Sequence, residues 1–260
     1  MTRVVLPVLL SLLLSCFVES GLSAESGLSG ESGLSGESVN ARWQSAIAND
    51  DAAMLARLLD QGSPEALLEQ TADNGKTALM VASKVGDLAL LRRLVSAGAA
   101  VDDVTRTGGT AFMFAVLGDR LRIARWLHDR GAELDSRGSN GWSAVTIAAA
   151  KGLVDTLDWL LVAGAAPDRA DIYGFTPLMR AVDNSHEAAV RRLLLTDANV
   201  DAMDEQGNSA LHHAIANGDD GIATLLVEAG ADDSLANRAG MTPRVMAEQS
   251  ATDKPSGSAR

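Results

Sequence analysis

Six glycine turns recur in this chain at a constant spacing, and that spacing constrains the fold more than any other feature. The glycines are residues 75, 108, 141, 174, 207 and 240, so every step is 33 residues with no insertion. Glycine adopts a positive φ without steric cost, so the chain can reverse direction at each one. A Thr or Ser follows two residues later and is suited to cap a helix. The sequence therefore predicts a tandem array in which each turn leads into a helix.

Each repeat of the array has the pattern of two helices. Pro177 and Pro243 fall at the first position of the first helix, where no backbone N–H is needed. An inward apolar residue follows, and three residues after it comes an alanine in all six copies: Ala82, Ala115, Ala148, Ala181, Ala214 and Ala247. A second helix ends at a Gly-Ala pair, where glycine supplies a left-handed residue. The fourth copy has Asp197 instead of that glycine, and we expect Asp197→Gly to stabilise the fold by about 0.5–1 kcal/mol.

The period of 33 and the sequence Thr176-Pro177-Leu178 resemble the ankyrin repeat. The resemblance implies an all-α fold, an ankyrin-repeat solenoid of stacked helix-turn-helix units with β-turn fingers. It also implies that the chain binds another protein on the surface formed by the stacked turns and first helices.

The predicted domain boundaries follow from the register of the repeats. They are an export segment 1–18, a Gly/Ser/Glu hexapeptide-repeat linker 19–38, an ankyrin-repeat domain 39–250 and a disordered tail 251–260. Within the domain we expect a degenerate N-terminal repeat 39–71, full repeats 72–104, 105–137, 138–170, 171–203 and 204–236, and a C-terminal cap 237–250. Arg244 replaces the inward apolar residue of the last copy, so we expect it to be exposed at the outer end.

The N-terminus predicts export. Arg3 precedes an apolar run of residues 4–14, which is too short to span a membrane and typical of a signal peptide. Cys16, the only cysteine, follows Leu13-Leu14-Ser15, which resembles a bacterial lipobox and implies a lipid anchor. In the alternative, Cys16 belongs to an ordinary signal peptide that is cleaved after Ser20 or Ala24.

Composition and motifs argue against several function classes. The net charge of −12 disfavours nucleic acid as a partner, because phosphate binding needs a basic surface. The four histidines are scattered, and no spacing of ligands predicts a metal site. No nucleophile motif or triad is present. We therefore expect a non-enzymatic protein without a cofactor.

Aromatic residues beside two successive turn glycines give the most specific site prediction. Trp142 and Phe175 occupy the same register one repeat apart, and Tyr173 lies just before Gly174. We expect the three rings to form one exposed patch, flanked by Ile172 and Arg106, that binds the partner. The alternative is that the rings fold back and seal the turns.

Three functions are consistent with these features. The first is an exported protein-binding module of the bacterial envelope, periplasmic or membrane-anchored, that inhibits or supports an envelope enzyme. The second is a membrane-tethered spacer without a high-affinity partner. The third is a secreted effector that mimics host ankyrin modules.

Overall fold

The computed structural model describes residues 38–253. These residues belong to two compact units, with the boundary between Asn140 and Gly141. All the regular elements described are helices, α2 to α15, and an isolated antiparallel bridge joins Val104 to Thr110 in one turn. The predicted all-α class is confirmed for this part of the chain. The repeat domain expected over 39–250 stays a prediction, and the two units are described separately below.

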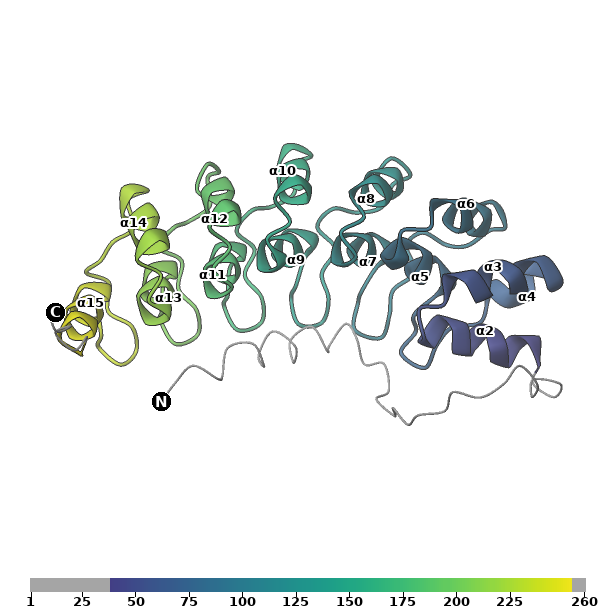
Figure 1. Cartoon of the computed structure of the whole chain (residues 1–260), viewed down its shortest axis with the longest axis horizontal. Coiled ribbons are helices and arrows are strands. Elements are labelled where there is room, and N and C mark those ends of the chain that lie inside the picture. The colour runs from purple at the N-terminus through teal and green to yellow at the C-terminus, as the bar shows by residue number, and fades with distance from the viewer. Residues whose placement is uncertain (1–37, 254–260) are drawn as a thin grey trace, which may run out of the picture. The chain divides into compact units, whose positions relative to one another are not determined.

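Unit 1 holds the degenerate repeat and the next two repeats. Its helices are α2 (Val39–Ala48), α3 (Ala52–Gln61), α4 (Pro64–Leu68), α5 (Ala78–Val85), α6 (Leu88–Ser96), α7 (Ala111–Leu117) and α8 (Leu121–His128). The first helices α5 and α7 pack side by side, and α6 and α8 pair with them as second helices (Figure 1).

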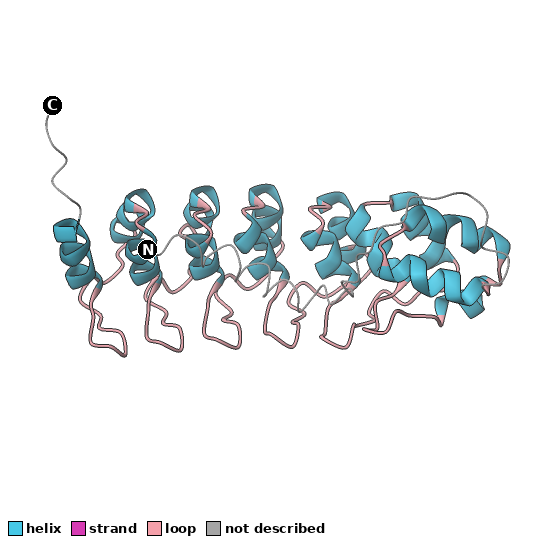
Figure 2. Cartoon of the chain, turned by 60° about the horizontal axis from the view of Figure 1, so that its bottom comes forward, coloured by secondary structure: helices cyan, strands magenta, loops and turns pink. Residues whose placement is uncertain are grey.

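Unit 2 holds the remaining repeats. Its helices are α9 (Ala144–Lys151), α10 (Val154–Val162), α11 (Pro177–Asp183), α12 (Glu187–Leu193), α13 (Ala210–Asn217), α14 (Asp220–Glu228) and α15 (Pro243–Asp253). Helices α9, α11, α13 and α15 form one row and α10, α12 and α14 a second (Figure 1). The turns project from the same side of the helices (Figure 2).

The predicted helix starts are present. The hydroxyl groups of Thr77, Thr110 and Thr176 each accept a hydrogen bond from the backbone N–H three residues later, at 3.4, 3.2 and 3.3 Å. Ser143 does the same with Thr146, at 3.2 Å. Each bond satisfies one of the N–H groups that a helix start leaves without a partner.

The inward faces are buried as the pattern predicts. Five of the six repeated alanines, Ala82, Ala115, Ala148, Ala181 and Ala214, are 0% exposed, so the neighbouring helices can approach closely. The sixth, Ala247, is exposed on α15, the last helix described. The inward leucines Leu79, Leu178 and Leu211 are each 2% exposed.

The end of α12 differs from the prediction. Gly98, Gly131, Gly164 and Gly230 have φ between +91° and +100°, as expected of left-handed helix ends, but Asp197 is absent from the residues with positive φ. In place of that conformation, Thr196 donates its hydroxyl to the carbonyl of Leu193 at 2.6 Å and accepts the N–H of Ala198 at 3.3 Å. Helix α12 ends at Leu193 because a threonine satisfies its last turn. The condition for a stabilising Asp197→Gly change is therefore not met.

Left-handed residues other than glycine occur elsewhere. Asp50, Asp119 and Ser185, which follow the first helices α2, α7 and α11, all have φ of 55°. The equivalent positions after α5, α9 and α13 are Gly86, Gly152 and Gly218. Asp50 holds this conformation while its carboxylate forms ion pairs with Lys76 and Lys84 at 3.0 and 2.7 Å. Burial alone raises the pKa of Asp50, but the hydrogen bonds and charges of the two lysines outweigh it and lower that pKa.

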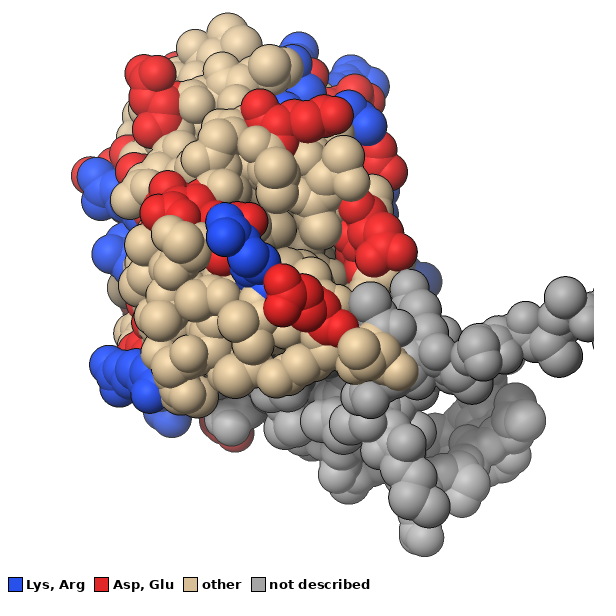
Figure 3. Space-filling model, turned by 90° about the vertical axis from the view of Figure 1, so that its left-hand side faces the viewer, with Lys and Arg blue, Asp and Glu red and all other residues tan. Residues whose placement is uncertain are grey.

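The C-terminal helix α15 is longer than the predicted cap. It continues to Asp253, three residues beyond the predicted boundary at 250. Arg244 is exposed as expected and forms an ion pair with Asp233 at 2.7 Å. Acidic and basic side chains are interspersed over this end of unit 2 (Figure 3), as suits an end that faces water.

The predicted export segment, including Cys16, lies outside the described residues, as do residues 19–37 of the linker and 254–260 of the tail. Among residues 38–253, no helix has the length and apolarity needed to cross a membrane.

Candidate protein-binding surface

The turn of residues 171–175 in unit 2 is fixed by the carboxylate of Asp171. Its Oδ1 accepts the backbone N–H groups of Tyr173 at 2.9 Å and Phe175 at 3.1 Å. Asp204 repeats the arrangement one turn later, where its Oδ1 accepts the N–H groups of Gln206 and Asn208, both at 2.8 Å. An aspartate at the start of the turn thus replaces hydrogen bonds that the reversed backbone cannot make with itself.

The other oxygen of Asp171 binds two side chains beneath the turn. Its Oδ2 accepts the indole N–H of Trp142 at 3.2 Å and the Arg180 Nε–H at 3.1 Å, and Arg180 also donates from Nη2. The carboxylate of Asp171 is 0% exposed and the Arg180 side chain 7%. A buried pair of charges is tolerated when each charge has a partner of opposite sign and its hydrogen bonds are satisfied.

Trp142 is a buried residue of this network and contributes no exposed ring. It is 1% exposed, so the prediction of an exposed patch is wrong for this residue, and the alternative in which the ring seals the turns describes it. An indole needs a partner for its N–H when it is buried, and Asp171 provides one. The Arg180 guanidinium carbon lies 5.4 Å from the Trp142 ring centroid.

Phe175 is half-buried and lies between side chains of α11 and α13. The Arg180 guanidinium carbon lies 4.0 Å from its ring centroid on one side. The ring of His213 lies 5.0 Å away on α13 of the next repeat. Phe175 therefore mainly supports the turn. We expected its ring to be exposed in the patch, whereas the residue is only partly exposed.

His213 extends the network into the following repeat. Its Nδ1 lies 3.0 Å from Asp183 Oδ1 and its Nε2 lies 2.9 Å from Asp204 Oδ2. Burial alone lowers the pKa of His213, but the hydrogen bonds and charges of Asp183 and Asp204 outweigh it and raise that pKa. Both ring nitrogens face carboxylates, an environment that favours the doubly protonated imidazolium.

Two apolar residues remain exposed at the tip of the supported turn. Ile172 is 53% exposed and Tyr173 44%, in agreement with their prediction as surface residues. The carbonyl of Tyr173 accepts the N–H of Glu205 at 3.0 Å, so the next turn lies directly beside it. We call Ile172, Tyr173 and the exposed Glu205 the fingertip surface.

Arg106 is exposed as predicted, but it belongs to a turn of unit 1. Its N–H donates to the carbonyl of Asn74 at 2.8 Å, which links two neighbouring turns of that unit. Arg106 and the fingertip surface are thus on different units and are treated as separate.

The sequence prediction missed Asp171, Arg180 and His213. A comparison of equivalent positions contains the signal for two of them. Positions 81, 114 and 147 are Val, Phe and Ile, whereas the next two copies have Arg180 and His213. A charged or titratable residue in an otherwise apolar register predicts a buried partner of opposite charge. Both partners, Asp171 and Asp204, start the turn of the same repeat.

The polar side chains described above act on the turns, where they satisfy backbone groups and pair with one another. Among residues 38–253, no group of three His, Cys, Asp or Glu side chains is arranged to hold a metal ion. In unit 2 the ion pairs of Asp171 with Arg180 and of His213 with Asp204 support the turns, and Arg192 pairs with Asp158 between the second helices α12 and α10.

Family models confirm the nature of the repeats. A model of ankyrin repeats in three copies matches residues 43–138 and 145–237, and a second model of ankyrin repeats in many copies matches residues 118–161. The chain belongs to the ankyrin-repeat family. Ankyrin-repeat proteins are protein-binding modules and are generally without enzymatic activity.

A solved structure supports the same assignment. The ankyrin-repeat domain of Bcl-3, described as a unique member of the IkappaB protein family, matches with 30% sequence identity and a TM-score of 0.65. The match covers 82% of this ankyrin-repeat protein and 97% of the Bcl-3 chain. No curated protein is similar enough in sequence to count as a match.

Proposed function

We propose that this ankyrin-repeat protein is a non-enzymatic binding module, exported to the bacterial envelope, that contacts a partner protein through the fingertip surface. The observation that carries the proposed contact is the exposure of Ile172 and Tyr173 on a turn that Asp171 holds from below. A turn that is already ordered loses little conformational entropy when a partner binds. Tyrosine is also among the residues that contribute most at protein interfaces.

Replacement of both tip residues tests this contact. The double variant Ile172→Ser with Tyr173→Ser removes the apolar tip and keeps the Asp171 hydrogen bonds, since these use backbone N–H groups. A photocrosslinking amino acid at Glu205 in the full chain, expressed in its native cells, first identifies the partner. Binding of the purified partner is then expected to weaken at least about tenfold in the double variant, equivalent to about 1.4 kcal/mol.

A matched control tests whether any exposed apolar side chain has the same effect on partner affinity as the two tip residues. Val162 is 84% exposed at the end of α10 and is not part of the fingertip surface, so Val162→Ser is expected to keep partner affinity. Unchanged affinity in the double variant, with its thermal melt intact, contradicts the proposed contact. Equal weakening in the Val162→Ser variant contradicts it as well.

Export rests on the signal-like N-terminus, and fractionation of native cells tests it. The proposal predicts protein in the envelope fraction. If Cys16 carries a lipid, metabolic lipid labelling is sensitive to globomycin and is lost in the Cys16→Ala variant. If no lipid label is incorporated and the mature protein begins after Ser20 or Ala24, the N-terminus is an ordinary signal peptide. Retention of the full chain in the cytoplasm contradicts export, and protein found only in the medium favours the effector alternative.

A further inference from the structure

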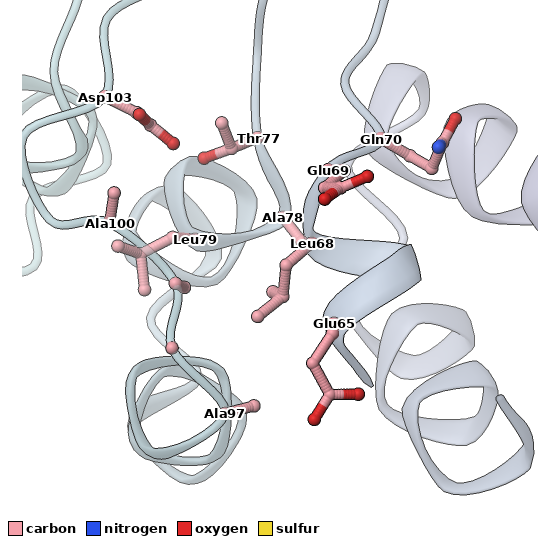
Figure 4. Close-up of a pocket in the computed structure, with 12 residues that line it drawn as sticks. Glu65, Leu68, Glu69, Gln70, Thr77, Ala78, Leu79, Ala97, Ala100 and Asp103 are labelled. Atoms are coloured by element: carbon pink, nitrogen blue, oxygen red, sulfur yellow. The ribbon is translucent and has the colours of Figure 1, made fainter. Parts of the chain in front are cut away.

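The degenerate first repeat of unit 1 contains a groove beside the short helix α4. From Gly62 to Gly98 the spacing is 36 residues, three more than in the other repeats, and the extra length lies around α4. Gly62 has φ of −114°, so the chain leaves α3 without the left-handed turn that the later second helices use. The chain continues directly into α4, which lies against the start of α5 and the loop after α6 (Figure 4).

The groove has an apolar floor and a volume of about 410 Å³. Leu68 projects from α4 toward Leu79 of α5, and Ala97 closes the lower side (Figure 4). Leu79 is buried, whereas Leu68 and Ala97 are half-buried and open to the groove. A concave apolar surface of this size accommodates a long side chain together with the backbone on either side of it.

The rim of the groove is acidic. Its twelve lining residues include Glu65, Glu69 and Asp103 and no Lys, Arg or His, so the formal charge of the lining is negative throughout. Glu65 lies in the first turn of α4 and Glu69 directly follows the helix, while Asp103 lies on the opposite wall (Figure 4). Like charges around one groove repel one another, and a cation between its walls relieves the repulsion.

The surrounding residues do not neutralise this charge. Glu65 accepts a hydrogen bond from the hydroxyl of Ser63 at 2.8 Å, which leaves its charge in place. The structure of residues 38–253 shows no ion pair to Glu69 or Asp103. By contrast, Asp50 in the same unit is paired with two lysines. The groove thus combines an apolar floor with a negative rim that lacks an internal counter-charge.

We propose that the α4 groove receives a lysine or arginine side chain of a partner protein, with the methylene groups on Leu68 and Leu79 and the cationic head among Glu65, Glu69 and Asp103. Lysine and arginine have this division between an apolar stem and a charged end. The inference rests on the proposed function only in assigning the groove to a protein partner. Its location in unit 1 makes it a second contact, separate from the fingertip surface.

Methyl NMR of the full chain with short peptides tests the groove directly. The probes are acetyl-Gly-Gly-Lys-Gly-Gly-amide, the same peptide with arginine, and the same peptide with norleucine, which keeps an apolar stem without the charge. The lysine or arginine peptide is expected to shift the methyl signals of Leu68 and Leu79 with saturation in the millimolar range. The norleucine peptide is expected to bind at least about tenfold more weakly, a difference of about 1.4 kcal/mol.

Charge-removing variants test whether the carboxylates of the groove rim bind the peptides or whether the negative charge of unit 1 as a whole does so. The double variant Glu69→Gln with Asp103→Asn is expected to lower the affinity for the cationic peptides at least about tenfold. The matched control Asp102→Asn with Asp129→Asn removes the same charge from exposed positions of unit 1 that do not line the groove, and affinity is expected to persist. Binding of the lysine peptide but not the arginine peptide, or the reverse, identifies which residue the groove takes.

Three results overturn the inference. They are no saturable shift of the groove methyls with either cationic peptide, equal binding of the norleucine peptide, and equal binding by the rim variant. Because the peptides have no other feature of the partner, these results leave the fingertip test unaffected. Conversely, loss of partner binding in the fingertip variant does not change the peptide result.

Discussion

Asp171 shows how one residue determines what a turn can present. Its carboxylate is buried, and it accepts hydrogen bonds from two backbone N–H groups of the turn and from Trp142 and Arg180 below it. Because every lone pair region is used, the buried charge is compensated and the turn is held in one conformation. The exposed side chains of Ile172 and Tyr173 are therefore supported by a buried polar network around Asp171.

His213 makes the stability of unit 2 depend on pH. Its pKa is raised in the folded protein, mainly because the carboxylates of Asp183 and Asp204 outweigh the effect of burial. A raised pKa means that the stabilisation is complete below the unfolded-state value of about 6.5 and is lost as the pH rises through the folded-state pKa. Urea unfolding of the wild type and the His213→Asn variant is expected to differ by about 1.5–3 kcal/mol at pH 6 and to converge at higher pH. A difference that grows with pH contradicts the charged pairing.

Asp119 adopts a conformation that glycine adopts more easily. It follows α7 with φ of 55°, is exposed, and no hydrogen bond through its side chain is described in residues 38–253. A left-handed conformation costs a non-glycine residue free energy, so Asp119→Gly is expected to raise the free energy of unfolding by about 0.5–1 kcal/mol. Asp197→Gly is the matched control. Asp197 lacks a positive φ, so that variant is expected to give no gain, and equal gains in both contradict the explanation.

At the scale of the element, the period of 33 predicted the helix pairs because glycine turns, hydroxyl caps and repeated alanines all act locally. The same reasoning failed where a particular side-chain contact or an insertion decided the outcome. Trp142 is buried because Asp171, 29 residues later, provides a partner for its N–H. Helix α12 ends early because the hydroxyl of Thr196 donates to the carbonyl of Leu193, and no left-handed residue follows at position 197. Helix α4 was not predicted, because the three extra residues of the first repeat have no equivalent positions in the other repeats.

The terminal helix α15 acts as a cap for α13. The His212 Nε2 lies 3.1 Å from the carbonyl of Met241, and α15 packs on α13. Truncation before residue 237 removes these contacts and exposes the face of α13, so the midpoint of thermal unfolding is expected to fall clearly. Truncation after Asp253 leaves α15 complete and is expected to change the midpoint little. Equal midpoints for the two truncated chains, measured by circular dichroism, contradict the role of α15.

At the scale of the whole molecule, stability is expected to be distributed repeat by repeat, because within each unit the repeats pack on their neighbours. Leu178 is 2% exposed in α11, and Leu178→Ala is expected to cost about 2–5 kcal/mol as a large-to-small change in the core. Native-state hydrogen exchange of the full chain is expected to show this loss of protection in α9, α11 and α13, which pack on one another, and not in α2 and α3 of unit 1. The exposed change Val162→Ala is the control and is expected to leave exchange unchanged. A uniform loss of protection from α2 to α15 contradicts local stability, because it shows that all the described repeats unfold as one cooperative unit.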